Sequence, residues 1–371
     1  MTHPPTTTYL FAGGGTGGHI FPALAIAEEL ATRDPGARFS WLVSDRAIDA
    51  KILSERDRPY EALPAKPFVT SPAGLLRFAT SWGPSVRAAR AHLQTACAHG
   101  DVRLIAMGGF VCPPAVRAAR AEGVPVALVN LDAVPGRANR WVAKRAARVI
   151  TACPAAGHAW DPVGPIVRAE ALPPGDARAC RSALGLDPER PTLFVSGGSQ
   201  GARSVNALVR AFVEAHADAL RAGGWQILHL TGDRSETDTA AACERAGVPA
   251  RTLAFLGSIG NAWGAADLAI ARSGAGSVAE AWASRTPTVF LPFPHHADDH
   301  QRLNADALVR AGGAMICTDR VEPDRNMTDH AQTVLALLAD ADRRAVMHDS
   351  LATLGPSDGA ARAADALLGA W

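Results

Sequence analysis

The chain has 371 residues, of which 48% are hydrophobic and 20% charged, and its formal net charge is +1. This length suits two domains with separate cores, and the balanced charge excludes a bulk electrostatic attraction to nucleic acid, so no nucleic-acid partner is expected. The six cysteines have no Cys-x-x-Cys spacing and are interpreted as reduced structural thiols. Residues 1–6 lack a signal-peptide pattern, and no apolar run predicts a transmembrane helix.

Strand and helix signals alternate along the first half of the chain. The first strand runs into a glycine-rich segment, Tyr9-Leu-Phe-Ala-Gly-Gly-Gly-Thr-Gly-Gly-His19-Ile-Phe-Pro22, and then into an apolar helix at 23–30. Further strands are predicted at 38–43, 102–106, 124–129 and 148–152, with helices at 114–122 and 138–147. This alternation favours βαβ units with parallel sheets. Residues 163–167, followed by the Pro-Pro-Gly turn at 173–175, form the predicted domain boundary.

The second half repeats the scheme. A strand at 193–196 leads into Gly197-Gly-Ser-Gln-Gly-Ala-Arg203 and another apolar helix. Strands follow at 226–230, 251–255, 268–271, 288–291 and 314–317, and an alanine-rich helix at 360–371. Glycine lets the backbone approach a ligand closely, and the helix behind it directs unpaired N–H groups at that ligand. Two such units predict twin α/β domains that hold a diphosphate compound between them.

Two polar segments of the second half indicate a nucleotide-sugar site. Arg272-Ser-Gly-Ala-Gly-Ser-Val-Ala-Glu280 follows a predicted strand, so its small residues can form an anion site at a helix start. Glu280 can accept hydrogen bonds from both hydroxyls of a ribose; alternatively it is a surface glutamate favoured by the helix dipole. Residues 292–305 suit sugar hydroxyls or phosphate. We expect no metal there, because the spacing of the histidines and aspartates matches no compact ligand set.

With these segments assembled, the chain resembles the MurG family of glycosyltransferases. The matching motifs are residues 13–22, Met107-Gly-Gly-Phe-Val111, residues 197–203 with Asn206, Arg272-Ser-Gly-Ala with Glu280, and His300-Gln301 with Asn304-Ala305. The resemblance implies a GT-B fold, with two Rossmann-like parallel-sheet domains facing across a cleft. It implies an acceptor and membrane-side domain at 1–164, a UDP-sugar domain at 165–350 and a C-terminal helix at 351–371, whose docking site the sequence leaves open.

The resemblance also implies an activity and a set of site residues. The activity is inverting transfer of GlcNAc from UDP-GlcNAc to a lipid-linked muramyl-pentapeptide, lipid I to lipid II, in peptidoglycan synthesis. It needs no cofactor and takes place at the cytoplasmic face of the cell membrane, where the protein is peripheral. The implied donor residues are Leu256 at the uracil, Glu280 at the ribose, Ser199, Ala275, Gly276 and Ser277 near the diphosphate and sugar, Arg168, and Gln301 with His300 at the GlcNAc hydroxyls. Thr16, Gly17, Gly18 and His19 are implied to face the sugar and the acceptor phosphates.

Two segments depart from the family pattern. Val129-Asn130-Leu131-Asp132 stands where the family usually has His-Glu-Gln-Asn, and Cys112-Pro-Pro stands where Ser-Gly-Pro is usual. A carboxylate near the donor diphosphate is repelled unless it is paired or protonated. His19 is our candidate general base because imidazole titrates near neutral pH. Its alternative role is to bond the sugar or a phosphate, and Asp132 is the rival base.

These departures leave other functions open. A GT-B transferase with another lipid or glycan acceptor, and a relative that binds nucleotide sugars without catalysis, both fit the sequence. A dinucleotide-dependent oxidoreductase would account for the spacing Gly13-x-Gly15-x-x-Gly18. That reading leaves the second glycine segment unexplained, and no acidic residue follows at a convincing ribose position.

One segment predicts contact with an anionic membrane surface. Leu75, Phe78 and Trp82 have the spacing of one helical face, with Arg87 and Arg90 nearby. A second basic and aromatic stretch contains Arg137, Arg140, Trp141, Lys144 and Arg145. Apolar side chains with a basic rim suit an anionic bilayer. Alternatively, this face packs into the domain core while the arginines reach back to solvent.

Overall fold

The computed structural model describes residues 6–15, 17–198, 201–232, 236–295, 298–369 and 371. Its contacts divide the chain into two compact units, residues 1–168 with 358–371 and residues 169–357. The division therefore falls a few residues after the boundary drawn from sequence, and the end of the chain belongs to the first unit. Among the described helices, none is both long and apolar enough to cross a bilayer.

The first unit is built on a seven-stranded parallel sheet with the order β3-β2-β1-β4-β5-β6-β7. Its strands are β1 (Thr7–Gly13), β2 (Arg38–Ser44), β3 (Tyr60–Leu63), β4 (Asp101–Gly108), β5 (Val126–Asn130), β6 (Arg148–Thr151) and β7 (Asp161–Pro162). Its helices are α1 (Gly17–Arg33), α2 (Ala47–Ser54), α3 (Pro72–Cys97), α4 (Cys112–Ala121), α5 (Arg137–Ala143) and α16 (Gly359–Leu368). The central strands are almost continuously apolar because both faces of the sheet are covered.

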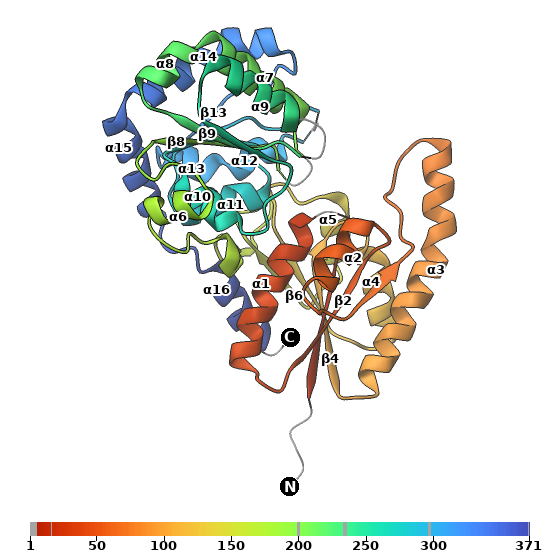
Figure 1. Cartoon of the computed structure of the whole chain (residues 1–371). Helices are drawn as coiled ribbons and strands as arrows, with labels where there is room; N and C mark the ends of the chain where they lie inside the picture. Colours follow the sequence, from red (N-terminus) through yellow and green to blue (C-terminus); the bar gives the residue numbers. More distant parts are fainter. Residues whose placement is uncertain (1–5, 16, 199–200, 233–235, 296–297, 370) are drawn as a thin grey trace. The chain divides into compact units, whose positions relative to one another are not determined.

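The C-terminal helix α16 packs beside α1 (Figure 1). Arg103, on β4, holds its end: the guanidinium donates to the carbonyl of Leu367 at 2.8 Å and lies 5.3 Å from the ring centroid of Trp371. Arg33, on α1, forms an ion pair with Asp365 at 2.6 Å. A helix leaves its last carbonyls without internal donors, and a cation there also favours the helix dipole. These contacts attach the end of the chain to the first unit.

The second unit has a six-stranded parallel sheet with the order β10-β9-β8-β11-β12-β13. Its strands are β8 (Thr192–Ser196), β9 (Gln226–Leu230), β10 (Ala250–Leu253), β11 (Leu268–Ala271), β12 (Thr288–Phe290) and β13 (Ala314–Ile316). Its helices are η1 (Ala169–Ala171), α6 (Ala177–Ala183), α7 (Arg203–Ala215), α8 (Ala217–Ala222), α9 (Glu236–Ala246), α10 (Ile259–Ala265), α11 (Ala275–Ser284), α12 (His300–Asn304), α13 (Asp306–Arg310), α14 (Pro323–Ala339) and α15 (Ala341–Ala352).

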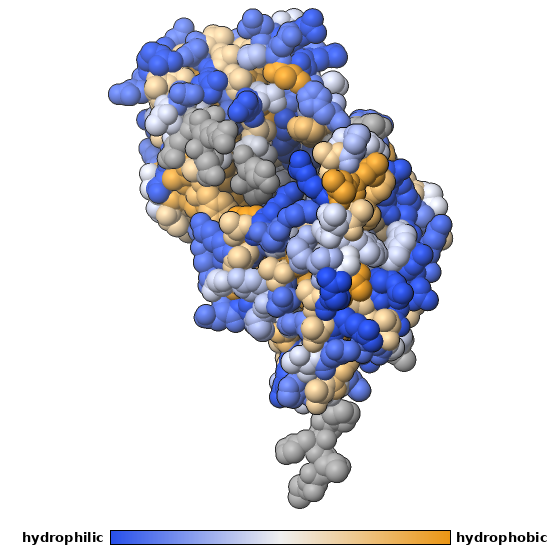
Figure 2. Space-filling view, turned by 90° about the vertical axis from the view of Figure 1, so that its right-hand side faces the viewer, coloured by the Kyte–Doolittle hydropathy of each residue, from blue (hydrophilic) through white to orange (hydrophobic). Residues whose placement is uncertain are grey.

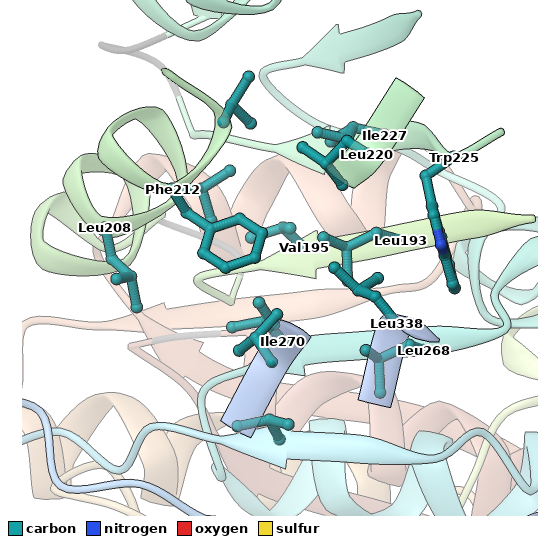
Figure 3. Close-up of a cluster of buried hydrophobic side chains, with 14 of the residues drawn as sticks. Leu193, Val195, Leu208, Phe212, Leu220, Trp225, Ile227, Leu268, Ile270 and Leu338 are labelled. Atoms are coloured by element: carbon teal, nitrogen blue, oxygen red, sulfur yellow. The ribbon is translucent and has the colours of Figure 1, made fainter. Parts of the chain in front are cut away.

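A core of the second unit forms where side chains of β8, β9 and β11 meet those of α7 and α14 (Figure 3). Leu193, Ile227 and Leu268 project from neighbouring strands, while Phe212 and Leu338 come from the helices. All are almost fully buried. The apolar residues of α7 recur on one face, so burying that face fixes the helix against the sheet.

The predicted fold class is confirmed: both units are parallel sheets with helices. Each predicted strand corresponds to an observed one, and 226–230 and 268–271 match to the residue. The predicted strand at 251–255 ends early at Leu253, and the predicted helix at 138–147 ends at Ala143. The short edge strands β3 and β7 were not predicted, because few residues and mixed polarity give them no clear period.

Both sheets reverse their strand order next to the first strand of the unit, between β1 and β4 and between β8 and β11. Ligands of open parallel sheets bind at this reversal, beyond the carboxyl ends of the strands. The glycine segments predicted from sequence follow β1, β4 and β8, and the segment starting at Arg272 follows β11. Each reversal is therefore lined by two of the predicted ligand-binding loops.

Candidate functional site

The first glycine loop is held by a buried carboxylate. Gly15 has φ +92°, and a side chain at Gly14 would begin only 2.5 Å from Oδ2 of Asp49. Asp49, in the first turn of α2, accepts hydrogen bonds from the backbone N–H of Gly15 at 2.6 Å and from the hydroxyl of Ser44 at 2.5 Å. Arg46 donates to the Gly15 carbonyl from the other side at 2.5 Å. Both polar groups of Gly15 are thus fixed. Thr16, predicted to be at the site, lies outside the described residues.

His19 lies on the first turn of α1, after Gly17 and Gly18, and its ring packs under the loop that follows β4. A Cβ atom added at Gly108 would lie 3.2 Å from Nε2 of His19, and a Cβ atom added at Gly109 would lie 3.2 Å from Cε1 of the same ring. Both glycines have positive φ, +108° and +80°. Burial lowers the pKa of His19, while the negative charges of Asp132 and, more weakly, Asp49 oppose this shift. The imidazole is therefore a neutral group at neutral pH, within electrostatic reach of Asp132.

Arg168 is the last residue of the first unit. It is buried, and its guanidinium carbon lies 3.7 Å from the centroid of the Phe21 ring, which belongs to α1. A guanidinium over an aromatic face at this distance is a cation–π contact. The contact fixes the orientation of Arg168 within the first unit. Its predicted role at the donor stays a prediction.

In the second unit, two loops border the reversal of the sheet. The loop after β8 requires glycine at position 201, which has φ +71° and where a side chain would begin 2.2 Å from the carbonyl oxygen of Thr231. Ser199, predicted to contact the diphosphate, lies outside the described residues. After β11, Gly274 caps α11, whose first turn contains the predicted donor residues Ala275, Gly276 and Ser277.

The start of α11 is open. Among the described residues, and apart from the adjoining chain, no atom lies within 4 Å of the position that a Cβ atom would take at Gly274 or at Gly276. The first N–H groups of a helix have no internal acceptor and carry partial positive charge. Space next to such a helix start suits a diphosphate.

Glu280 lies on α11 beyond Gly276 and Ser277, and is half-buried. Its Oε2 accepts a hydrogen bond from Nε1 of Trp263 at 2.9 Å. Leu256, predicted to be at the uracil, follows β10 and is also half-buried. The glutamate is therefore held by a side chain of α10, which sequence analysis did not single out.

The segment after β12 is tied to the loop after β11. Asn304, on α12, donates to the carbonyl of Ser273 at 3.3 Å. At the start of α12, Nδ1 of His300 lies 2.7 Å from Oδ1 of Asp298. Gln301 accepts the backbone N–H of Phe293 through Oε1 at 2.8 Å. The structure thus brings these two predicted donor segments together within the second unit.

Arg272, the first residue of the predicted donor segment, makes its contacts inside the second unit. Its guanidinium points into the second unit, where it pairs with the buried carboxylate of Asp319 at 2.7 Å and donates to the hydroxyl of Ser204 at 2.8 Å. It also donates to the carbonyls of Leu291 and Pro292 at 2.8 and 3.0 Å. Arg272 therefore joins the chain beyond β11, β12 and β13 to the start of α7.

Comparison with known proteins supplies the family. The glycosyltransferase family 28 N-terminal domain matches residues 9–151, and the family 28 C-terminal domain matches residues 192–362. The UDP-N-acetylglucosamine–N-acetylmuramyl-(pentapeptide) pyrophosphoryl-undecaprenol N-acetylglucosamine transferase of a Nocardioides species is 37% identical, over 97% of both chains. The enzyme of the same name from Clavibacter michiganensis is also 37% identical, over 97% of this chain and 95% of its own. The chain belongs to the MurG family, within glycosyltransferase family 28.

The MurG fold is also found by comparison of structures. The crystal structure of Acinetobacter baumannii MurG superposes with a TM-score of 0.73 and covers 98% of this chain and 99% of its own, at 24% identity. A kitacinnamycin glycosyltransferase superposes with a TM-score of 0.63 at 18% identity. The present chain accordingly has the fold of these proteins, with two Rossmann-like units.

The first departure from the MurG pattern has a structural explanation. Asn130, at the end of β5, is fully buried and donates to the carbonyl of Asp132 at 2.7 Å and to the hydroxyl of Thr151 at 3.0 Å. Its Oδ1 accepts from Asn139 at 2.9 Å. A glutamate could not make the two donations, because an ionised carboxylate only accepts. Asn130 therefore shapes the loop that carries Asp132.

The second departure, Cys112, also acts within the fold. The thiol is fully buried, contacts the carbonyls of Ala12 and Gly108, each at 3.0 Å, and receives the Gly108 N–H at 3.2 Å. Burial raises its pKa to about 12, so it is a neutral thiol. A cysteine here links the ends of β1 and β4, as a serine hydroxyl could.

Four residues of the site escaped sequence analysis: Asp49, Trp263, Ser204 and Asp319. Each contacts a residue that is distant in sequence, so no local motif marks it. The signal that was available is compositional: Asp49 and Asp319 stand close to apolar segments, where a carboxylate is expected to be paired. Among the described residues, no group of three His, Cys, Asp or Glu side chains could hold a metal ion.

Proposed function

We propose that this chain transfers GlcNAc from UDP-GlcNAc to a lipid-linked N-acetylmuramyl-pentapeptide acceptor, with inversion at the anomeric carbon, in peptidoglycan synthesis. The observation that carries the proposal is the alignment over 97% of the chain with relatives that are named for this transfer. Such coverage includes both Rossmann-like units, and with them both the donor and the acceptor segments.

The donor binds the second unit. The open start of α11 at Gly274–Ser277 supports a role in holding the diphosphate, since helix dipoles stabilise the negative charge that develops as UDP departs. Glu280 accepts the ribose hydroxyls, and Leu256 borders the uracil. Gln301 and His300 bind the GlcNAc hydroxyls. Ser199 and Arg168 complete the donor set by resemblance.

The acceptor is activated in the first unit. An acceptor hydroxyl attacks the anomeric carbon, the bond to the UDP oxygen breaks with its electron pair, and the hydroxyl proton passes to His19. The lowered pKa of this buried imidazole supports the role, because the base must be unprotonated before attack. Asp132 is the alternative base. Thr16, Gly17 and Gly18 face the sugar and the acceptor phosphates.

A second candidate is transfer to a different lipid or glycan. It is favoured by Asn130 and Asp132, which replace two side chains of the usual family pattern. The same substitutions would fit a relative that binds the nucleotide sugar and transfers nothing. Both readings change the acceptor side and leave the donor segments as they are.

The acceptor is lipid-linked, so the protein works as a peripheral protein at the cytoplasmic face of the membrane. The first unit exposes an apolar patch at the start of α3. It is formed by Phe68 and Val69, which precede the helix, and by Leu75 and Leu76 in its first turns, and is called the α3 patch below. Figure 2 faces the side of the molecule on which α3 lies in Figure 1, and it shows a compact cluster of hydrophobic (orange) atoms surrounded by hydrophilic surface. Phe78 and Trp82 continue it as half-buried rings, and the Arg137 guanidinium lies 5.6 Å from the Phe68 ring. Exposed apolar side chains with a basic rim support contact with an anionic bilayer.

The test is incubation with radiolabelled UDP-GlcNAc and a lipid I analogue, followed by product analysis. The proposal expects one labelled GlcNAc on the acceptor for each UDP released. UDP release only with another lipid or glycan would establish the second candidate. UDP-GlcNAc binding without release in the presence of any acceptor would identify the non-catalytic relative.

A further inference from the structure

The indole of Trp263 and the carboxylate of Glu280 are joined by a hydrogen bond of 2.9 Å, from Nε1 to Oε2. The two residues come from different helices, Trp263 from α10 and Glu280 from α11. An indole can only donate, and a carboxylate only accepts when ionised. With Glu280 ionised, the bond is charge-assisted, which makes it stronger than a bond between neutral groups.

Trp263 is held in one orientation by its surroundings. Its side chain is 1% exposed, and its ring meets the ring of Phe194 edge-on, with centroids 5.0 Å apart. The hydroxyl of Thr286 donates to its backbone carbonyl at 3.1 Å. A buried indole that loses its acceptor leaves an unsatisfied N–H, which is costly. The tryptophan cannot turn away, and so the position of its N–H fixes the position of Glu280 Oε2.

Glu280 needs such support. A glutamate has three rotatable bonds, and ordering it on binding a ligand costs conformational entropy. A carboxylate that is already oriented binds hydroxyl groups without that cost, which is the general benefit of preorganisation.

We propose that Trp263 is a positioning residue for ribose recognition: its N–H holds Glu280 in the rotamer that accepts the ribose hydroxyls of the UDP-sugar. This inference rests on the proposed function, in which Glu280 contacts the ribose. Trp263 itself does not touch the donor. The specificity for a ribonucleotide therefore depends on a buried side chain of α10.

The competing explanation is that Trp263 only fills the core between α10 and β8. A purely structural role would weaken every ligand of the second unit alike. A positioning role acts through the ribose hydroxyls alone. The affinity ratio of UDP to 2′,3′-dideoxyuridine diphosphate separates the two, because the ligands differ only in those hydroxyls.

The experiment measures both affinities by calorimetry, for the unmodified chain and for Glu280→Ala, Trp263→Phe, Trp263→His and Phe212→Leu. We expect UDP to bind the unmodified chain about ten- to a hundredfold more tightly, as hydrogen bonds to a charged group predict. Glu280→Ala should bring this ratio close to one. Trp263→Phe should lower it by about three- to tenfold while the affinity for the dideoxy ligand stays unchanged. Trp263→His, which keeps a ring N–H, should have a ratio between those of Trp263→Phe and the unmodified chain.

Phe212→Leu is the matched packing control, since Phe212 is a buried aromatic residue of the second-unit core on α7 and takes no part in the hydrogen bond. It should leave the ratio as it is. An unmodified ratio near one would refute the ribose contact of Glu280, and with it that part of the proposed function. A normal ratio that falls in Glu280→Ala but survives in Trp263→Phe would refute the role of Trp263 alone.

A measurement on the unmodified indole covers the case in which Trp263→Phe does not fold. In chain labelled with ¹⁵N-tryptophan, one indole N–H resonance should move upfield in Glu280→Gln, because the charged acceptor has become neutral. The chemical shift of the same resonance should change when UDP is added, and should change much less when the dideoxy ligand is added. A set of indole resonances that responds equally to both ligands would overturn the inference.

Discussion

Arg272 and Asp319 form a buried ion pair, with Nη1 and Oδ2 2.7 Å apart, at the carboxyl edge of the second sheet. Ser204 donates to the same carboxylate oxygen at 2.6 Å, and Asn326 and the Val321 N–H donate to the other. Burial alone would raise the pKa of Asp319, but these hydrogen bonds and the charge of Arg272 bring it below its usual value. Each charge neutralises the other in the protein interior. The pair therefore holds the segments after β11, β12 and β13 together only while both side chains are present.

Removing either Arg272 or Asp319 should therefore lower the stability of the second unit strongly, although neither is a predicted donor contact. Asp319→Ala leaves a buried guanidinium without its counter-charge, and we expect a loss of about 3–5 kcal/mol in the free energy of unfolding. Urea denaturation measures it. The matched control is Asp329→Ala, which breaks the exposed pair with Arg320 and should change stability little. Equal losses in the two variants would contradict a clamping role for Arg272.

Asp49 should control the first glycine loop in the same way. Asp49→Ala removes the acceptor of the Gly15 N–H and of the Ser44 hydroxyl, and each buried donor left unpaired costs about 1–3 kcal/mol. We expect transfer to fall steeply while UDP affinity stays unchanged, because the donor residues of α11 belong to the other unit. Asp45→Ala, which removes the exposed partner of Lys66, is the control and should retain transfer. Parallel loss of UDP binding would count against a local effect.

His19 should set the acidic limb of the rate profile. Its pKa is lowered by burial, so the limb should lie below pH 6.5, the ordinary value. His19→Ala should lower turnover by roughly 10²–10⁴-fold with UDP-GlcNAc affinity retained. Turnover that survives this substitution would leave His19 a binding residue only.

Asp132→Asn separates the two candidate bases. The carboxylate of Asp132 raises the pKa of His19, and Asp49 adds a weaker effect of the same sign. Removing the charge of Asp132 should therefore move the acidic limb to lower pH and leave the rate at neutral pH similar. Loss of turnover at every pH would instead identify Asp132 as the base.

The α3 patch should determine binding to anionic liposomes. Leu76 is 65% exposed, and Leu76→Glu adds a negative charge while removing apolar area. Burying one leucine side chain in a bilayer is worth about 1.5–3 kcal/mol, so the partition constant for liposome binding should fall about tenfold or more. Val346→Glu is matched, since Val346 is equally exposed but lies on α15 in the second unit. Sedimentation at low salt compares them; if both variants pellet alike, the patch is not the membrane face.

The segments that sequence analysis predicted well are those in which a single stretch of chain carries the whole signal. The strand at 268–271 is buried and apolar. Position 201 requires glycine, because its φ is positive and the Thr231 carbonyl leaves no room for a side chain. Such features depend on local conformation and composition.

The residues that were missed act across the fold. Trp263 looks like any core aromatic until α11 places a carboxylate next to its N–H, and Arg272 was named only as the first residue of the donor motif, without a role of its own. Its real partner, Asp319, is distant in sequence, and only the parallel order of β11, β12 and β13 brings the two together. Side-chain direction at a sheet edge follows from neighbouring strands, which a single segment does not specify.

His229 should make the second unit sensitive to acid. It is fully buried on β9, its Nε2 donates to Oδ1 of Asn206 at 3.0 Å, and burial lowers its pKa to about 3. The unfolded chain takes up a proton near pH 6.5 that the folded chain refuses, so this histidine contributes stability above pH 6.5 that is lost as the pH falls toward about 3. The free energy of unfolding should drop by about 1.4 kcal/mol per pH unit in this window from His229 alone.

Urea titrations between about pH 4 and pH 6 measure the slope, which His229→Gln should reduce by that amount even if it also lowers stability at every pH. His348→Gln, at an exposed position on α15, is the matched substitution and should keep the original slope. An unchanged slope in His229→Gln would mean that the buried ring is protonated in the folded chain, although its Nδ1 has no hydrogen-bond partner among the described residues.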